Sequence, residues 1–306
     1  MPVIITFFTV LTIWSTTPLA IQISHQSMSN VSAVAFRMLL AFIITGLAVA
    51  ILRPQSALKV KNLPLYLSAS IALFPSMSVV YFASTFINSG LIAVMFSLTP
   101  VISGFMAWVI LKEPLFLWNK MVALGLAIAG SAIIFLDDVV IDSNAVKGLG
   151  LMLVSNTFFC LSQVLTKKSN INRNVDAMEQ TLGAIFLSLP GLFLCWWVFD
   201  GVAPINASDK SLWALVYLAV IGSFVGFIAY YHLLSKVSVA VISVIPLITP
   251  VLSLILGALV NDEQITENIM MGCLLIVCGL AIYDEALVNK LKAYFGKLRM
   301  NGESAG

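Results

Sequence analysis

The residues of this chain that could do chemistry are polar and aromatic side chains set inside long apolar runs. A polar group inside a membrane is costly, so it usually faces a cavity or a neighbouring helix. Aromatic and hydroxyl groups together suit a zwitterionic or amphipathic solute of modest size. The candidates for binding such a solute are Trp14, Thr17, Arg37, Ser78, Tyr81, Phe82, Met95, Ser97, Asn156, Gln163, Tyr230 and Tyr231.

Arg37 is the most informative single candidate, because it is the basic residue that lies within a predicted span. It is about six residues, or roughly 9 Å at the helical rise, from the outer end of its run. Its side chain could extend to the membrane interface or clamp backbone carbonyl groups. It could instead be the counter-ion of a substrate carboxylate. The sequence leaves these readings open.

Several other candidates also have two readings. Trp14 lies near the middle of its run, so it is either a cavity wall or a packing residue, since interfacial aromatic residues lie at the ends of spans. Tyr81, Tyr230 and Tyr231 either line a cavity or belong to the interfacial aromatic belt. Asn156 lies deep in its run, where an amide without a partner costs several kcal/mol. It either bonds to a neighbouring helix or contacts the substrate.

The sequence carries none of the motifs of zinc proteases, serine hydrolases or P-loop ATPases. The four cysteines, Cys160, Cys195, Cys273 and Cys278, lie inside apolar runs without metal-ligand spacing, so they are predicted to be packing residues. An enzyme would need a clustered nucleophile and base or a set of metal ligands. The sequence therefore predicts no catalytic residue, no cofactor, no metal site and no nucleic-acid partner.

The elements that must position the candidate residues are membrane-spanning helices. Hydrophobic residues make up 60% of the chain and charged residues 10%, against about 45–50% and 25% in a soluble domain. A span needs roughly 20 apolar residues and must satisfy its own backbone groups, which makes each run a helix. The predicted fold is an all-α polytopic membrane protein with ten transmembrane helices, at residues 3–23, 31–52, 63–86, 90–111, 117–136, 148–166, 178–199, 211–234, 238–260 and 268–287.

Two stretches of the chain form an internal sequence repeat. Residues 87–113 and 237–263 align at a shift of 150 positions with 7 identities in 27 positions, where apolar segments would share roughly 2 or 3 by chance. Five helices in each half is an odd number, so the halves must enter the membrane in opposite senses. The sequence predicts two inverted five-helix repeats, at residues 3–136 and 148–287.

Inverted repeats typically enclose a site between the halves, and one half rocks against the other to alternate access to that site. Prolines within spans remove a backbone donor and free a carbonyl about one turn earlier. Pro100, Pro246 and Pro250 are therefore the candidate kinks at which the helices could move.

The distribution of lysine and arginine predicts the orientation. With the N-terminus inside, the inner loops and the tail hold thirteen of the 16 basic residues, and the outer loops hold Lys147 and Lys210. This bias is the positive-inside pattern, so both termini are expected in the cytoplasm. The tail, residues 288–306, is basic beside apolar residues and is expected to lie on anionic membrane lipid. We expect the first run to be a helix and not a cleaved signal peptide, because no basic residue precedes it.

This pattern resembles the drug/metabolite transporter superfamily, and within it the EamA-domain family. The resemblance covers about residues 3–287 and is carried by Trp14-Ser15-Thr16, Arg37, Thr99-Pro100 with Glu113-Pro114, Thr249-Pro250 with Glu263, and Gly272 with Gly279. It implies a ten-helix transporter of the bacterial inner membrane that exports amino acids, other metabolites or toxic organic compounds. The chain departs from the pattern at Gln264, where the first half has Pro114, and at Phe158, near the position that matches Trp14.

The combined prediction is a secondary transporter that exports amino acids or related small metabolites by alternating access. Glu179 is the only carboxylate near a span, so facilitated transport or exchange is expected, with proton coupling as the alternative. Small residues seven positions apart, Ala123 with Gly130 and Gly272 with Gly279, predict close helix packing or a homodimer face. The other readings are a non-transporting membrane scaffold or receptor and, less expected, an integral membrane enzyme.

Overall fold

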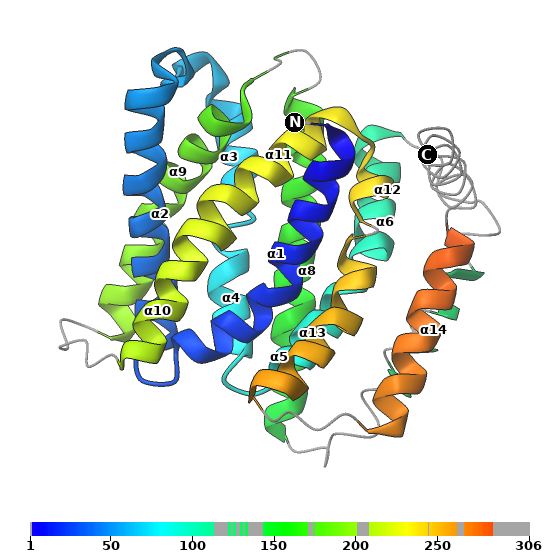
Figure 1. Cartoon of the computed structure of the whole chain (residues 1–306). Coiled ribbons are helices and arrows are strands. Elements are labelled where there is room, and N and C mark those ends of the chain that lie inside the picture. Colours follow the sequence, from blue (N-terminus) through cyan, green and yellow to red (C-terminus); the bar gives the residue numbers. More distant parts are fainter. Residues whose placement is uncertain are drawn as a thin grey trace, which may run out of the picture.

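The computed structural model is helical in all the secondary structure of its described residues (Figure 1). These residues are 2–112, 122–123, 125–126, 129–130, 132–133, 143–170, 173, 175–200, 208–243, 245–261 and 266–283. The α-helices are α1 (Val3–Ser24), α2 (Asn30–Leu52), α3 (Leu63–Ser70), α4 (Ser76–Ala83), α5 (Ser89–Phe96), α6 (Thr99–Leu111), α8 (Ser143–Asn170), α9 (Ala177–Phe199), α10 (Asp209–Tyr217), α11 (Gly226–Lys236), α12 (Val239–Ile242), α13 (Ile245–Asn261) and α14 (Glu267–Tyr283). The 3-10 turns η1 (Pro54–Ser56) and η2 (Val60–Asn62) follow α2, and a π-helix, η3 (Leu218–Val225), joins α10 to α11.

The described helices coincide with the predicted apolar runs. Among the described residues, 6 single or joined helices are long and apolar enough to cross a membrane, at Val3–Ser24, Asn30–Leu52, Ser89–Leu111, Asn144–Asn170, Ala177–Phe199 and Asp209–Lys236. These helices indicate a multi-pass arrangement. Most of the predicted span 117–136 and all of the tail 288–306 lie outside the described residues, so the count of ten spans stays a prediction.

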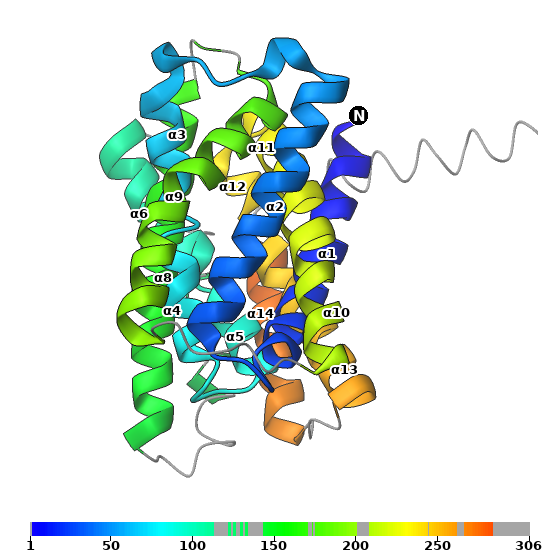
Figure 2. The same cartoon turned by 90° about the vertical axis from the view of Figure 1, so that its left-hand side faces the viewer.

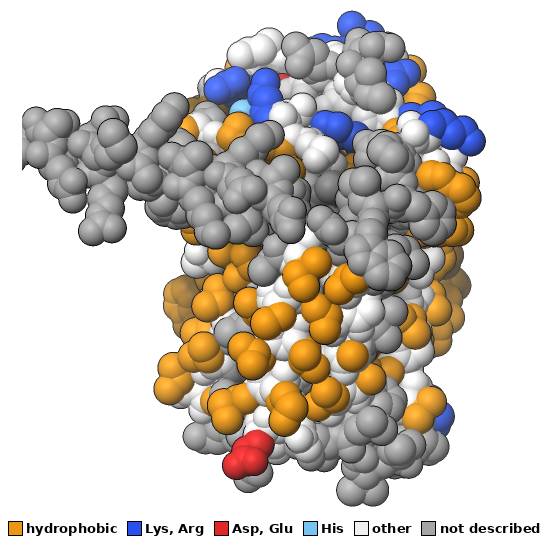
Figure 3. Space-filling view, turned by 90° about the vertical axis from the view of Figure 1, so that its right-hand side faces the viewer, with side chains coloured by type: hydrophobic (Ala, Val, Ile, Leu, Met, Phe, Trp, Pro, Cys, Tyr) orange, Lys and Arg blue, Asp and Glu red, His pale blue; other side chains and the backbone are white. Residues whose placement is uncertain are grey.

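The face of the molecule drawn in Figure 3 is apolar around the middle of the bundle and basic toward one end. Ile51, Trp213 and Leu259 are 74%, 73% and 76% exposed. Large apolar side chains exposed in this way are unfavourable in water and favourable in lipid. The interior, by contrast, holds polar side chains such as Arg37 and Asn156. This distribution is that of a protein whose surroundings are hydrocarbon.

The fourth predicted span is interrupted where proline removes a backbone donor. α5 ends at Phe96, and α6 begins at Thr99-Pro100. The carbonyl of Phe96 is the one that Pro100 leaves without its helical N–H partner. The hydroxyl of Thr99 donates to that carbonyl oxygen at 2.5 Å. The threonine thus satisfies the acceptor that the adjacent proline frees, which a lipid environment requires.

In the ninth predicted span a threonine hydroxyl also satisfies the carbonyl that a proline frees, but the helix is interrupted at a different position. The hydroxyl of Thr249 donates to the carbonyl oxygen of Pro246 at 3.3 Å, four residues before Pro250. α13 nevertheless begins at Ile245-Pro246 and continues through Pro250. Among the predicted kinks, Pro100 and Pro246 therefore occupy the second position of a restarted helix, whereas Pro250 lies inside one.

The packing of helices is reciprocal between the two halves of the chain. α1 packs against α13, α11 and α10 of the second half, and α8 packs against α6, α4 and α3 of the first half. α2 lies beside α9 (Figure 2), and α5 packs on α13. The first helix of each half is thus held mainly by helices of the other half. Any space at the centre of the bundle is consequently lined from both halves.

Gly130, in the predicted fifth span, lies against α14. A Cβ atom at Gly130 would be 2.5 Å from the carbonyl oxygen of Gly272 and 2.9 Å from a side-chain carbon of Ile276. The small residues predicted to allow close approach therefore do so within one chain at this point. The predicted homodimer remains a prediction.

Candidate substrate pocket

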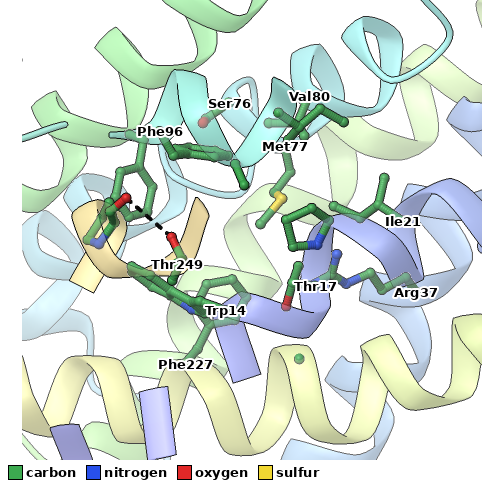
Figure 4. Close-up of a pocket in the computed structure, with 16 residues that line it drawn as sticks. Trp14, Thr17, Ile21, Arg37, Ser76, Met77, Val80, Phe96, Phe227 and Thr249 are labelled. Carbon is green, nitrogen blue, oxygen red and sulfur yellow. Dashed lines mark hydrogen bonds between the residues drawn. The ribbon is translucent and has the colours of Figure 1, made fainter. Parts of the chain in front are cut away.

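A pocket lies at the centre of the bundle, between helices of both halves (Figure 4). The space free of atoms in the pocket and in its mouth, open solvent included, is about 700 Å³. α1, α2, α4 and α5 contribute from the first half, and α8, η3, α11 and α13 from the second. The lining residues are Trp14, Thr17, Pro18, Ile21, Arg37, Ser76, Met77, Val80, Ile92, Ala93, Phe96, Phe159, Gly222, Phe227, Pro246 and Thr249.

Four of the residues predicted for the site line this pocket, namely Trp14, Thr17, Arg37 and Pro246. Most of the remaining lining is apolar, and it includes Met77, Val80 and Phe227. Sequence reasoning missed these residues because an apolar side chain within an apolar run carries no signal of the face it occupies. Their identity follows only from the way the helices assemble.

Arg37 is 1% exposed and turns its guanidinium toward the pocket (Figure 4). Its Nε donates to Oγ of Ser223 at 2.9 Å, and its Nη1 donates to the hydroxyl of Tyr81 at 3.3 Å. Both partners are neutral. Glu179, a buried carboxylate of the described residues, pairs with Lys59 and not with Arg37. Arg37 therefore neither reaches the interface nor clamps a carbonyl group, because its partners are two side-chain hydroxyls.

The π-helix η3 places two residues against Arg37. Its wider turns interrupt an otherwise continuous helix from Asp209 to Lys236, and π-helical segments of this kind frequently occur at functional sites. Ser223 in this segment accepts the Nε bond. Next to it, a Cβ atom at Gly222 would lie 3.2 Å from Nη2 of Arg37, so the absence of a side chain makes room for the guanidinium. A sequence-based helix prediction does not reveal such a segment.

An aromatic cluster forms one wall of the pocket. The ring of Trp14 lies 5.2 Å from that of Tyr230 and 5.6 Å from that of Phe159, centroid to centroid. Phe159 also lies 5.9 Å from Phe96. Trp14 is thus both a cavity wall and a packing residue. The hydroxyl of the neighbouring Tyr231 donates to the carbonyl oxygen of Ala69 at 3.3 Å.

The predicted tyrosines lie in the interior and not in an interfacial belt. Tyr81, Tyr230 and Tyr231 are 1%, 1% and 2% exposed. Tyr81 does not line the pocket itself, but its hydroxyl accepts a hydrogen bond from Arg37, which does. Tyr230 supports the ring of Trp14. Each of these tyrosines contacts a residue that lines the pocket.

Asn156 joins helices. Its Oδ1 accepts from the hydroxyl of Thr99 at 2.9 Å, and its Nδ2 donates to the carbonyl oxygen of Met95 at 3.0 Å. The oxygen and the nitrogen of the amide therefore both form hydrogen bonds at the break between α5 and α6. Of the two readings of Asn156, the structure shows the interhelical hydrogen bond.

The remaining predicted residues also lie outside the pocket lining. Met95 and Ser97 are buried beside the helix break, and Phe82 packs edge-on against Phe199 at 5.6 Å. The hydroxyl of Ser78 and the amide of Gln163 are buried without a hydrogen-bond partner among the described residues. The structure therefore does not bring these five residues to the pocket surface.

Glu179, the carboxylate predicted to lie near a span, is buried at one end of the bundle and already has donors. Its Oε1 accepts from Asn62 at 2.6 Å and from Tyr66 at 2.5 Å, and its Oε2 pairs with Nζ of Lys59 at 3.3 Å. Among the described residues, no group of three or more His, Cys, Asp or Glu side chains could hold a metal ion.

The fold occurs in a solved crystal structure. That structure matches the chain with a TM-score of 0.73 and 16% sequence identity, and the match covers 93% of this chain and 97% of the other. At this level of identity the match establishes a shared fold.

The sequence comparisons give the family. Residues 1–136 and 146–283 each match the model of the EamA-like transporter family. The uncharacterized transporter YoaV of Bacillus subtilis (strain 168) is 22% identical over 270 residues, which are 88% of this chain and 91% of that protein. An uncharacterized transporter of Archaeoglobus fulgidus is 24% identical over 285 residues, covering 89% and 94% of the two chains. These matches confirm the resemblance drawn from the sequence, and the chain belongs to the EamA-like transporter family.

Proposed function

We propose that this transporter exports amino acids or related small metabolites across the bacterial inner membrane by alternating access. The observation that carries the proposal is a central pocket lined from both halves of the chain, with an aromatic wall, hydroxyl groups and one guanidinium. Transport sites typically lie between two halves of this kind. The family and the names of the relatives support a transporter and not an enzyme.

Alternating access requires two halves that can exchange roles. The reciprocal packing of α1 and α8 supports an inverted repeat, since each first helix is held by the other half. In Figure 1, α1 runs from the end of the bundle marked N to the opposite end, whereas α8 runs the other way. The breaks at Ser97 and Ser243 interrupt one helix in each half near the pocket. Rocking of one half about these breaks would expose the pocket to each side in turn.

The orientation follows from charge. The connection between α2 and α3, the end of α8 and the end of α11 lie at the end of the bundle where α1 begins, and α8 begins at the opposite end (Figure 1). The first three segments carry Lys59, Lys61, Lys168 and Lys236, and the start of α8 carries Lys147. Under the positive-inside rule the end with more basic residues faces the cytoplasm. Both termini would then be cytoplasmic, and export would carry substrate from the basic end to the other.

The acidic side chains favour facilitated transport or exchange over proton coupling. A proton-coupled carrier usually needs an intramembrane acid or histidine relay. Among the described residues, the pocket lining contains no Asp, Glu or His side chain. The carboxylate of Glu179 already accepts three hydrogen bonds at the end of the bundle.

The test is counterflow in proteoliposomes. Liposomes containing the purified protein are loaded with one unlabelled solute, and uptake of the same labelled solute is followed without any ion gradient, over a panel of amino acids, amines and carboxylates. A carrier concentrates the label transiently, and protein-free liposomes do not. Absence of counterflow for every solute would contradict transport and favour a scaffold or receptor, whereas a requirement for a proton gradient would favour proton coupling.

A further inference from the structure

We propose that Arg37 makes the pocket a site for organic anions with one carboxylate on an apolar or aromatic body, and that an α-amino group is not required. The inference rests on the proposed function, because it names the solute class for the same pocket. It follows from a charge that the described structure leaves without a counter-ion.

Arg37 carries a permanent positive charge that is buried. A guanidinium is always protonated in proteins and presents five N–H donors. At 1% exposure Arg37 is removed from bulk solvent, yet the described structure pairs it with two neutral hydroxyls. A buried charge without an opposite charge is strongly unfavourable. A bound anion would supply the missing partner.

The acidic side chains near α2 are used elsewhere. Asp200 accepts hydrogen bonds from the hydroxyls of Ser29 and Ser32, at the start of α2. Glu179 pairs with Lys59. The described structure thus assigns these two carboxylates to other partners and leaves the guanidinium facing the pocket.

Two hydrogen bonds hold the guanidinium of Arg37 in one orientation. Ser223 fixes Nε and Tyr81 fixes Nη1, so the plane of the guanidinium is held from two sides. These two hydrogen bonds of Arg37 use Nε and Nη1, and Gly222 leaves room beside Nη2. A planar group held in this way can bind a carboxylate through parallel N–H bonds. Lysine, a point charge on a flexible stem, would not reproduce this geometry.

The rest of the pocket lining would contact the body of the solute. Beyond Arg37 the lining is mainly apolar or aromatic, with Trp14, Met77 and Phe227 among its members. This surface suits the apolar body of a solute. Among the described residues of the lining, no carboxylate could pair with an ammonium group. The pocket therefore recognises the acid function, and the amino group of an amino acid adds little.

The alternative role of Arg37 is structural, as a clamp that joins α2 to α4 and η3. Both roles predict that removal of the charge is harmful. They differ in whether binding depends on the charge of the solute. The test therefore compares solutes of one shape and different charge on the same protein.

The probes are 3-phenylpropanoate, 3-phenylpropanamide, 3-phenylpropylamine and phenylalanine. Binding to the purified full chain in detergent is measured by the rise in its unfolding temperature with probe concentration, and counterflow is measured in proteoliposomes. We expect the carboxylate and phenylalanine to bind with dissociation constants within about threefold of each other. We expect the amide and the amine to bind at least about tenfold more weakly, since a charge-assisted hydrogen bond is lost.

The variants separate the two roles of Arg37. Arg37→Gln is expected to abolish the preference for the carboxylate, and Arg37→Lys to weaken its binding at least about tenfold. Ser223→Ala and Gly222→Ala keep the guanidinium and disturb its position, so they should weaken the carboxylate more than the amide even if Arg37 variants fail to fold. Lys210→Gln, which removes a positive charge outside the pocket, should change no dissociation constant.

The outcomes distinguish this inference from the proposed function. Equal binding of the amine and the carboxylate to the unmodified protein, or an unchanged preference in Ser223→Ala and Arg37→Gln together, would overturn the inference and leave transport intact. Selective carboxylate binding without counterflow would support the anion site and contradict transport. Failure of every probe to bind would overturn the inference, and the wider counterflow panel would then decide the proposed function.

Discussion

Arg37 and Glu179 are both buried charged side chains, and their surroundings differ in kind. Glu179 accepts hydrogen bonds from Asn62 and Tyr66 and pairs with Lys59, so its charge is balanced within the protein. Arg37 meets only hydroxyls among the described residues. A balanced buried charge serves structure, whereas an unbalanced one beside a pocket is expected to serve a ligand.

The structural role of Glu179 can be tested by removing one of its donors. Tyr66→Phe is expected to lower the free energy of unfolding by about 1–3 kcal/mol, because a buried carboxylate loses a hydrogen bond. Ser68→Ala is the control on the same helix, since the hydroxyl of Ser68 bonds to the carbonyl oxygen of Pro64 and to the hydroxyl of Ser169, and not to a carboxylate. Unfolding in mixed micelles with increasing SDS measures both. Equal effects of the two variants would argue against a special role for the buried carboxylate.

Trp14 is the pocket residue whose loss should affect transport most directly apart from Arg37. Trp14→Ala removes a ring that packs on Phe159 and Tyr230. We expect the transport rate at low substrate to fall about tenfold, the equivalent of about 1.4 kcal/mol of lost contact. Trp213→Ala, at an exposed position, is the control. Initial counterflow rates are compared at equal amounts of membrane-inserted protein, and a loss of insertion would instead assign Trp14 to packing.

At the scale of elements, the irregular parts of the helices are the parts that build the pocket. Phe96 lies at the end of α5, directly before a helix break, and Pro246 lies at the start of α13, directly after one. Gly222 lies in a π-helix. Each irregularity changes the direction or the width of a helix where it meets the pocket. Regular helices alone would not present these groups to a common space.

Close packing of helices is testable at two glycines in one predicted span. Gly130→Ala would place a Cβ atom 2.5 Å from the carbonyl oxygen of Gly272, so we expect a loss of about 1–3 kcal/mol in unfolding free energy from overpacking. Gly125→Ala is the matched control, because its Cβ would meet no atom within 4 Å. Both variants are measured by SDS unfolding. A destabilising Gly125→Ala with a neutral Gly130→Ala would contradict the packing of this span on α14.

At the scale of the whole molecule, the described residues expose large apolar side chains on the outside and bury polar side chains such as Arg37 and Asn156 among apolar ones in the interior. The central pocket is shared because α1 and α8 each pack within the opposite half. A pocket shared in this way changes shape whenever the halves move relative to each other, which alternating access requires.

Orientation of the whole molecule can be tested by labelling. Single cysteines replace Lys147, Lys210, Lys59 or Lys168 in a background in which Cys160, Cys195, Cys273 and Cys278 are serine or alanine. A membrane-impermeant thiol reagent on intact cells should label the cysteines at 147 and 210, and those at 59 and 168 only after permeabilisation, because the end with more basic residues is expected to face the cytoplasm. Labelling of 147 and 59 from the same side would contradict the proposed orientation and the inverted repeat.

The sequence by itself determined the helical class, the positions of most spans and the family. The physical reason is that hydrocarbon imposes long apolar runs whose backbone bonds are satisfied locally, so a span is visible in a stretch of about 20 residues. The role of the Thr-Pro pairs is also local, since the hydroxyl of Thr99 reaches the carbonyl of Phe96 three residues away.

The tertiary structure decided which polar groups share the pocket. A helix surrounded by lipid is apolar on its outer face as well as its packed face, so periodicity does not show which side faces inward. The partners of Arg37 illustrate this limit, because Tyr81 is 44 positions away and Ser223 is 186 positions away. The position of Ser223 depends further on a π-helical segment, and the apolar wall of the pocket depends on how helices of both halves meet. These features arise from long-range packing, which no local pattern in the sequence encodes.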